Sequence, residues 1–304
     1  MPNYLVSIVG PTAIGKTALS IKLAKIYSTE IISADSRQFY KEMHIGTAAP
    51  TQSELKAAKH HFIHHKSIED SYSVGDFEQE AIDKLNQLFK SKNTVIMVGG
   101  SGLYLDAVTK GLDYFPKIKP GIRDELNQQL STKGLRHLTS QLKKLDPVTF
   151  ESIDLNNPHR VIRALEVCLS SGKAYSTFLR SKNKKRNFQV ISIGLMAERP
   201  IIYKRINRRV EQMIKDGLLN EVKNLQSKMH LNALNTVGYK ELFKYLNGDW
   251  ELDFAISEIK KNTRRFAKRQ ITWFKRNEKT IWFDLEANIK KITQQIELEK
   301  RKTK

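Results

Sequence analysis

The sequence predicts an α/β fold in which helices flank a parallel β-sheet and a mostly helical segment is inserted into the sheet domain. Two short apolar runs, Leu5–Val9 and Ile31–Ala34, enclose a stretch whose apolar residues recur at helical spacing. Strand, helix and strand in this order are typical of the start of a parallel sheet. Further strand-like runs follow at Thr94–Val98 and Gln189–Leu195, and the segment between these two runs has helical periodicity.

The segments between the strands carry helix signals. Asp76 and Gln79 stand at capping-box spacing and predict a helix that starts near Phe77. In the inserted segment, Asn157 followed by Pro158 is a favourable helix start. We therefore expect a catalytic core of residues 1–114 and 187–304 and a helical insertion domain of residues 115–186.

After Glu198 the pattern is helical to the end of the chain. We expect one stripe of this region to be buried, with two arginines one turn apart beside it. The stripe consists of Ile202, Ile206, Val210 and Met213, and the arginines are Arg205 and Arg209. A later helix should bury Ala267, Ile271 and Phe274 and expose a stripe of Arg265, Lys268, Arg269, Thr272 and Arg276.

Charge and composition restrict the function. The 304 residues include 52 lysines and arginines against 32 aspartates and glutamates, a net charge of +20. This excess indicates a polyanionic partner, with nucleic acid the first candidate, and a generally basic surface is the alternative. No run approaches the ~20 apolar residues of a membrane span, and the first strand follows Pro2 directly. We therefore expect a cytoplasmic protein with no membrane segment, whose single cysteine, Cys168, packs in a core.

Residues 10–17 read GPTAIGKT between a predicted strand and a predicted helix. This is the G-x-x-x-x-G-K-[ST] pattern of a P-loop. Gly10 and Gly15 allow backbone amides to point at an anion, Lys16 adds a cation, and the Thr17 hydroxyl suits Mg²⁺. The motif predicts a P-loop-type sheet that binds a polyphosphate, and it leaves the reaction open.

Polar residues also follow the second and third predicted strands. Asp35 closes the second strand, where parallel sheets place ligands, so it is a candidate general base; a turn or helix cap is the alternative. The third strand ends in Gly99-Gly100-Ser101-Gly102, where a nucleotide hydrolase would offer an aspartate for its metal. This loop favours a crevice that approaches a substrate closely, with a plain glycine turn as the alternative.

Six motifs together resemble those of one family. GPTAIGKT, ADSRQFYKEMHIGTAAP, VGGSGLYL, RVIRALEV, VGYKE and TRRFAKRQITWF occur in the order found in bacterial tRNA dimethylallyltransferases. Those enzymes transfer a dimethylallyl group from its diphosphate to the exocyclic amine of the adenosine 3′ of the anticodon. The resemblance implies that the P-loop binds the diphosphate leaving group, with Mg²⁺ as cofactor. It implies dimethylallyl diphosphate and a tRNA anticodon arm as partners, and we expect a monomer.

The resemblance also implies roles for individual residues. Asp35 would accept the proton of the adenine amine, Ser101 replaces the family's usual threonine and keeps its hydroxyl, and Lys16 and Arg209 would neutralise the pyrophosphate. The implied diphosphate-binding residues are Gly10, Thr12, Ala13, Ile14, Gly15, Lys16 and Thr17, with Thr17 beside Mg²⁺. The implied tRNA-binding residues are Asp35, Ser36, Arg37, Gln38, Ser101, Arg123, His159, Arg160, Val161, Ile162, Arg163, Lys268, Arg269, Gln270 and Arg276.

Three other functions share some of these features. A small-molecule kinase would use the same P-loop on ATP, and an isopentenyltransferase acting on free adenine nucleotides would share the loop and Asp35 but would have little use for the positive charge. A non-enzymatic RNA-binding protein would not need Asp35, Lys16 and Thr17. The histidine-rich run KHHFIHHK has pairs four apart that could bind zinc from a helix, although no cysteine or carboxylate set accompanies them. Trp273 and Trp282 are candidates for base stacking, with core packing favoured.

Overall fold

The computed structural model describes residues 2–179 and 185–302. Residues 1, 180–184 and 303–304 lie outside this range. The chain divides into two compact units. The first, here called the sheet unit, comprises Met1–Lys110 and Arg186–Lys304, and the second, the helical unit, comprises Gly111–Lys185. The helical unit overlaps the segment expected as an insertion, residues 115–186.

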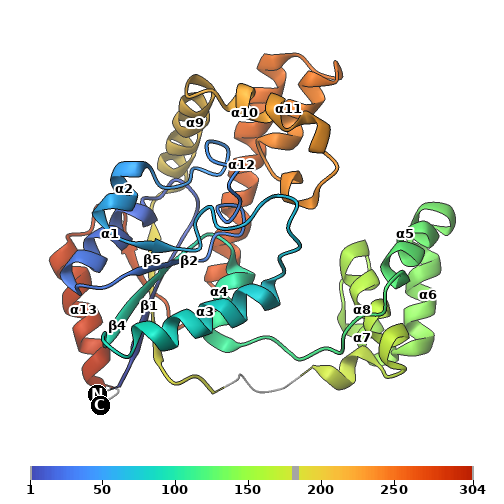
Figure 1. Cartoon of the computed structure of the whole chain (residues 1–304), viewed down its shortest axis with the longest axis horizontal. Helices are drawn as coiled ribbons and strands as arrows, with labels where there is room; N and C mark the ends of the chain where they lie inside the picture. The colour runs from blue at the N-terminus through green and yellow to red at the C-terminus, as the bar shows by residue number, and fades with distance from the viewer. Residues whose placement is uncertain (1, 180–184, 303–304) are drawn as a thin grey trace. The chain divides into compact units, whose positions relative to one another are not determined.

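The sheet unit contains one six-stranded sheet in which all strand pairs are parallel, in the order β3-β2-β4-β1-β5-β6 (Figure 1). The strands are β1 (Tyr4–Val9), β2 (Ile31–Ser33), β3 (His60–His61), β4 (Thr94–Val98), β5 (Gln189–Met196) and β6 (Ile281–Asp284). The predicted α/β class and four predicted strands are confirmed. The expectation of helix throughout the region after Glu198 is wrong at β6, which pairs with β5 at the edge of the sheet.

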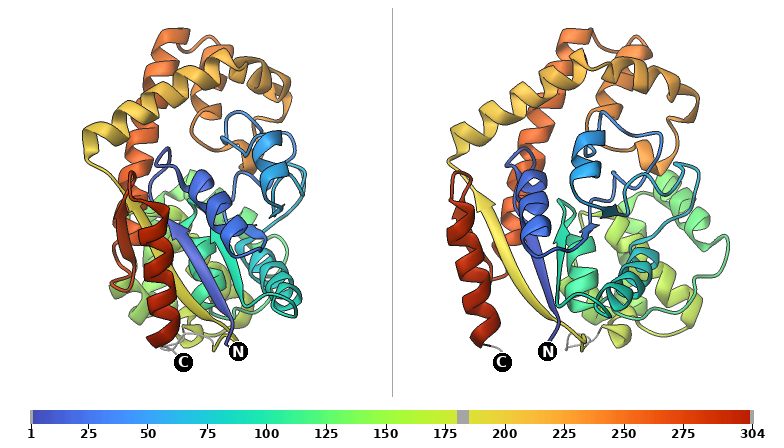
Figure 2. Two further views of the ribbon diagram at one scale, coloured as in Figure 1. Left: turned by 90° about the vertical axis from the view of Figure 1, so that its left-hand side faces the viewer. Right: turned by 60° about the vertical axis from the view of Figure 1, so that its left-hand side comes forward.

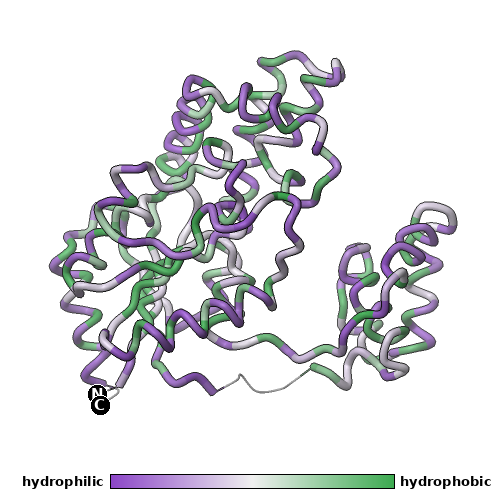
Figure 3. The backbone as a smooth tube through the Cα atoms, viewed as in Figure 1, coloured by the Kyte–Doolittle hydropathy of each residue, from purple (hydrophilic) through white to green (hydrophobic). Residues whose placement is uncertain are grey.

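The central strands are buried on both faces because helices cover both. On β1, Val6 and Ile8 pack into a cluster with α1 (Lys16–Ile26), α9 (Arg199–Lys215) and α13 (Ile289–Lys302), whereas Leu5 and Val9 pack into a second cluster with α3 (Val74–Leu88) and α4 (Gly102–Lys110). Figure 2 shows α1 and α13 lying along the sheet, and the strands form a mainly hydrophobic part of the tube in Figure 3. This double burial explains why the strands read as unbroken apolar runs.

The helix α3 starts earlier than its sequence pattern predicted. Ser73 is the N-cap, and its hydroxyl accepts a hydrogen bond from the Asp76 amide while the Asp76 carboxylate accepts from the Ser73 amide. Asp76 is therefore the third residue of a capping box and not the cap itself. The pattern of Asp76 and Gln79 had placed the cap at Asp76, three residues after the observed N-cap Ser73.

A third cluster joins three further helices of the sheet unit. These are α10 (Leu218–Asn224), α11 (Tyr239–Leu246) and α12 (Leu252–Phe274), which pack against the C-terminal half of α9. Of the predicted stripe, Ile202, Ile206 and Val210 are buried, and Met213 is half-buried. The unit also contains α2 (Gln52–Ala57) and two short 3₁₀ helices at Gln226–Lys228 and Asn232–Leu234. None of the helices within residues 2–179 and 185–302 is long and apolar enough to cross a membrane.

The helical unit has its own core. Its elements are α5 (Ile122–Lys133), α6 (Leu135–Leu145), α7 (Pro147–Ser152), α8 (Pro158–Ser171) and a 3₁₀ helix at Tyr175–Phe178. Asn157 caps α8 by accepting a hydrogen bond from the Arg160 amide at 3.3 Å, as predicted. Cys168 is buried on α8, and burial raises the pKa of its thiol, which confirms a packing role.

The loop after β4 passes so close to β2 that a side chain does not fit at Gly99. A Cβ there would lie 2.3 Å from the carbonyl oxygen of Ala34, a backbone atom that cannot rotate away. We expect Gly99→Ala to lower the free energy of unfolding by about 1–3 kcal/mol, measured by urea denaturation. The control is Gly75→Ala, where the nearest atom is the Ser73 hydroxyl at 3.5 Å. Equal stability of the two variants would contradict the close approach.

Candidate active site

The P-loop forms a tight turn between β1 and α1. Gly10 and Gly15 have φ of 141° and 107°, and a Cβ at Gly10 would lie 2.6 Å from the Leu195 carbonyl oxygen. The Lys16 ammonium folds back over the loop and donates to the carbonyl oxygens of Gly10 at 3.0 Å and Pro11 at 2.8 Å. Burial lowers the pKa of Lys16 to about 8, against the opposing charge of Asp35. An anion bound beside this buried ammonium would therefore stabilise its charged form.

Two arginines of α9 face the same loop. The Arg205 Nε donates to the Ala13 carbonyl oxygen at 2.7 Å, and the Arg209 Nη1 donates to the Thr12 hydroxyl at 3.3 Å. Burial, together with the charge of Arg205, lowers the pKa of Arg209. The predicted spacing of one helical turn thus brings both guanidinium groups to the P-loop, where they add to the positive charge of Lys16.

Asp35 lies in the segment directly after β2, facing the loop after β4. Its Oδ1 accepts a hydrogen bond from the Arg37 amide at 3.2 Å, and its Oδ2 lies 3.4 Å from where a Cβ on Gly100 would be. Burial raises the pKa of Asp35, although the Arg37 amide and the Lys16 charge oppose the shift. A carboxylate with a raised pKa is a better proton acceptor than an exposed one.

Ser101 contacts the same segment. Its hydroxyl accepts a hydrogen bond from the Ser36 amide at 3.0 Å and lies 3.0 Å from the Ser36 hydroxyl. The hydroxyl group, which serine and threonine both have, is therefore hydrogen-bonded at this position. It joins the loop after β4 to the loop that carries Asp35.

Gln270 is a buried link between two loops of the site. Its Oε1 accepts from the Thr12 amide at 2.8 Å, and its Nε2 donates to the Gly100 carbonyl oxygen at 2.9 Å. Only 5% of Gln270 is exposed. Both polar ends of the amide are used inside the protein, at the wall of both cavities, and the predicted contact of Gln270 with tRNA stays a prediction.

Two adjoining cavities meet at these residues. One, of about 330 Å³, is lined by the P-loop and is called here the P-loop cavity. The other, of about 500 Å³, is lined by Ser101, Arg37 and the apolar side chains of Val210 and Met213, and is called the outer cavity. The residues that line both are Thr12, Asp35, Thr47, Ala48, Gly100, Arg209, Phe266 and Gln270. Asp35 therefore lies between the P-loop cavity, which Lys16 lines, and a larger, more apolar cavity.

Several predicted tRNA-binding residues lie elsewhere. Val161 and Ile162 are buried in the core of the helical unit, so their side chains are not available to RNA. On the same helix, His159 and Arg160 are exposed, and Arg163 lies 3.6 Å from Glu166. Arg123 also forms an ion pair with Glu166. Lys268 and Arg269 on α12 are exposed, and so is Arg276 in the turn that follows this helix, which agrees with the predicted stripe.

Two of the residues after Asp35 bind the protein's own backbone. The Arg37 guanidinium donates to the carbonyl oxygens of Asn232, Ala233 and Asn235 at 3.0, 2.8 and 3.4 Å. The Gln38 amide donates to the carbonyl oxygens of Thr47 and Ala48 at 3.2 and 3.1 Å. These side chains shape the walls of the cavities, a role that their motif did not predict.

The histidine-rich run is not helical, so the spacing argument for zinc is wrong. His60 and His61 form the strand β3, and His61 lies 2.5 Å from Glu30. Within residues 2–179 and 185–302, no group of three or more histidine, cysteine, aspartate or glutamate side chains could hold a metal ion. Trp273 packs its ring against Gly102 and donates to Asp106 at 3.1 Å, which agrees with packing rather than base stacking.

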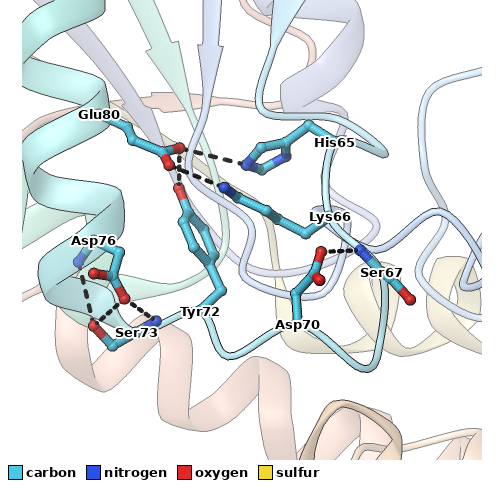
Figure 4. A network of polar contacts seen from close by, with 8 residues as sticks. All are labelled: His65, Lys66, Ser67, Asp70, Tyr72, Ser73, Asp76 and Glu80. Carbon is cyan, nitrogen blue, oxygen red and sulfur yellow. Dashed lines mark hydrogen bonds and ion pairs between the residues drawn. The ribbon is translucent and has the colours of Figure 1, made fainter.

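A polar network beside this run holds the chain next to the site (Figure 4). Glu80 accepts hydrogen bonds from Lys66 at 2.9 Å and from the Tyr72 hydroxyl at 2.8 Å, and lies 3.8 Å from His65. Burial lowers the pKa of His65 to about 4, so the ring is neutral at physiological pH. The amides of His65 and Lys66 both donate to the Phe39 carbonyl oxygen, which holds the segment that carries Asp35.

Some residues of the site were not predicted from the sequence. Arg205 was recognised only as a neighbour of Arg209, although the helical spacing that placed Arg209 applies equally to it. Phe266, Glu54 and His60 line the P-loop cavity. Phe266 and His60 lie in segments that the sequence singled out, TRRFAKRQITWF and KHHFIHHK, but their places in the cavity depend on how distant segments pack.

Comparisons with known proteins agree with this geometry. The family model described as IPP transferase matches residues 38–277. A tRNA dimethylallyltransferase of Christiangramia forsetii is 58% identical over 297 residues, 98% of each chain. One of Bacteroides thetaiotaomicron is 48% identical over 283 residues, 93% of this chain and 92% of the other.

Solved structures are also similar. A tRNA isopentenylpyrophosphate transferase of Bacillus halodurans has a TM-score of 0.71 at 38% identity, with 97% of this chain and 94% of the other covered. A eukaryotic dimethylallyltransferase, described as acting on tRNA, has a TM-score of 0.80 at 25% identity and covers 93% of this chain and 74% of its own. With its P-loop, its buried carboxylate and relatives of this similarity, the chain belongs to the IPP transferase family.

Proposed function

We propose that the protein transfers a dimethylallyl group from dimethylallyl diphosphate to the exocyclic amine of the adenosine 3′ of the anticodon in tRNA, releasing pyrophosphate. The observation that carries the proposal is the place of Asp35 on the wall shared by the two cavities. The names of the relatives support the same reaction. In this proposal the diphosphate binds in the P-loop cavity and the adenine enters the outer cavity.

The leaving group requires positive charge. As the bond between C1 of the allyl group and the diphosphate oxygen breaks, negative charge grows on the diphosphate. The ammonium of Lys16 and the guanidinium groups of Arg205 and Arg209 lie where they would stabilise that charge. Donors held in place before the reaction typically contribute several kcal/mol to such stabilisation.

The nucleophile requires a base. The adenine amine is a weak nucleophile because its lone pair is delocalised into the ring. As its nitrogen forms the new bond to C1, Asp35 would accept the proton that the amine loses. A positioned base of this kind contributes roughly 10²–10⁴-fold to a rate. The target base would have to leave its stack to enter the outer cavity.

Oxygen atoms in the P-loop cavity suit Mg²⁺. The Thr17 hydroxyl lines the cavity together with Ser33 and the carboxylates of Asp35 and Glu54, and Mg²⁺ prefers oxygen ligands. Thr17 would hold the ion in the cavity where the diphosphate is proposed to bind. The ion would supply further neutralisation of the leaving group.

The exposed basic stripe of α12 is proposed to bind the tRNA backbone. We expect Arg269→Gln to weaken tRNA binding and to reduce the slope of log K against log salt by about 1, because one phosphate contact is lost. Pyrophosphate affinity should not change. Binding is measured by filter assay at several salt concentrations, with Lys290→Gln on α13 as a charge-matched control. An unchanged salt slope in Arg269→Gln would remove this residue from the RNA surface.

The direct test of the function is a reaction with defined substrates. The protein is incubated with dimethylallyl diphosphate, Mg²⁺ and unmodified tRNA, and the digested nucleosides are weighed by mass spectrometry. We expect one adenosine to gain the mass of a dimethylallyl group. Parallel reactions contain AMP in place of tRNA, or ATP in place of the prenyl donor. Prenylation of AMP alone would support the nucleotide transferase, and ATP turnover would support the kinase.

A further inference from the structure

A carboxylate outside both cavities binds a row of backbone amides in the loop that forms their shared wall. Glu221, on α10, accepts hydrogen bonds from the amides of His44, Ile45 and Gly46 at 3.0, 2.7 and 2.9 Å. Its Oε1 also accepts from the Tyr239 hydroxyl at 2.6 Å. Consecutive amides pointing at one anion form a nest, a geometry that proteins otherwise use for bound phosphates.

Tyr239 packs against the same loop. Its side chain is fully buried, and a Cβ on Gly46 would lie 2.5 Å from its ring. Burial, with the nearby charge of Glu221, raises the pKa of Tyr239, so the hydroxyl keeps the proton that it donates. The contact between Gly46 and Tyr239 thus leaves the loop almost no freedom to move toward α11.

The loop leads directly into the cavity wall. Thr47 and Ala48 line both the P-loop cavity and the outer cavity. Ala48 has a φ of 49°, a conformation that a residue with a side chain adopts only when its surroundings impose it. Gln38 holds the carbonyl oxygens of these two residues from the other side. Without Glu221, the amides of residues 44–46 would lose their side-chain acceptor.

Tyr239, the partner of the carboxylate, belongs to a segment that also lines the outer cavity. Gly238 and Lys240, the neighbours of Tyr239, line the outer cavity. Glu221 therefore binds both the amides of residues 44–46 and the hydroxyl of Tyr239, the first residue of α11. Its carboxylate joins two segments that both line the outer cavity.

We propose that Glu221 is a positioning residue, which sets the width of the substrate cavities by binding the amides of residues 44–46 and the hydroxyl of Tyr239. The inference rests on the proposed function, since it assumes that dimethylallyl diphosphate binds beside Thr47 and Ala48. Asp35 and Lys16 are held by other contacts, so loss of Glu221 should affect substrate binding more than the chemical step.

The test compares two carboxylates that each hold a loop. Glu42 accepts hydrogen bonds from the Ser67 hydroxyl at 2.7 Å and the Ile68 amide at 3.1 Å, and it lines neither of the two substrate cavities. Glu221→Ala and Glu42→Ala are compared with the parent in thermal unfolding, in steady-state kinetics and in calorimetric binding of pyrophosphate. Both variants should lose stability. Only Glu221→Ala should raise KM for the prenyl donor, by about tenfold, with kcat within about threefold of the parent.

Chemical rescue distinguishes positioning from stability. Glu221→Ala leaves the nest without an acceptor, and acetate offers a carboxylate of the same chemistry. We expect added acetate to lower the raised KM toward the parent value and to have no such effect on the parent or on Glu42→Ala. An unchanged KM in Glu221→Ala, or a raised KM that acetate leaves unaltered, would overturn the proposal.

If the proposed function itself is wrong, the experiments give a different result. If the parent protein shows no prenyl transfer, pyrophosphate binding alone decides the inference. About tenfold weaker binding in Glu221→Ala with parent-like binding in Glu42→Ala would support positioning of the anion site. Equal affinities in the two variants would overturn it.

Discussion

Asp35→Asn is expected to lower kcat by roughly 10²-fold or more while leaving tRNA binding almost unchanged. The amide keeps the size and the hydrogen-bond acceptor that the Arg37 amide uses. It cannot accept the proton of an adenine amine. Single-turnover prenylation at saturating donor and tRNA measures the chemical step, and a filter assay measures tRNA affinity.

The control for this variant is Asp83→Asn, on the exposed face of α3. It makes the same chemical change at an aspartate that lines neither substrate cavity. We expect parent-like turnover from it. Turnover of Asp35→Asn equal to that of Asp83→Asn would show that another group accepts the proton.

The pH dependence of the parent gives an independent check on Asp35. Burial raises the pKa of this carboxyl, and only its ionised form can act as a base. The value of kcat/KM should therefore fall as the pH is lowered through that raised pKa, which lies above the usual range of an aspartate. The Asp35→Asn variant should lack this acid limb.

The edges of the sheet could not be predicted from the sequence, whereas its centre could. The central strands β1 and β4 are covered by helices on both faces, so they read as unbroken apolar runs. By contrast, β3 is two histidines and β6 is the four residues IWFD. These edge strands form because they pair with the neighbouring strands, β3 with β2 and β6 with β5. On β6, Trp282 fits over Gly194 of β5, where a Cβ would lie 2.4 Å from the ring.

In the candidate site, too, some residues could be predicted from the sequence and others could not. The P-loop and Asp35 were predicted because their local patterns have a chemical meaning by themselves. Gln270 and Glu221 were not predicted in their structural roles, because their main partners are backbone amides and carbonyls of segments far away in the chain. Every residue offers such groups, so the sequence contains no sign of which ones a buried glutamine or a carboxylate will bind.

Replacing the P-loop lysine should have the second large effect. Lys16→Met removes the ammonium and keeps an unbranched side chain of similar length. We expect kcat/KM for the prenyl donor to fall by about 10²–10³-fold, because one preorganised cation is lost from the departing diphosphate. Pyrophosphate should also bind more weakly in calorimetry. Lys22→Met is the control, since Lys22 lies on the same helix α1 with an exposed side chain.

The ammonium also predicts a basic limb in the pH profile. Burial lowers the pKa of Lys16 to about 8, so in the free protein the cation is progressively lost above that pH. The parent's kcat/KM should therefore decline above about pH 8, because it reports the free enzyme. A bound diphosphate favours the charged lysine and should move the corresponding decline in kcat to higher pH. If Lys16→Met kept the parent's basic limb, the titrating group would be another residue.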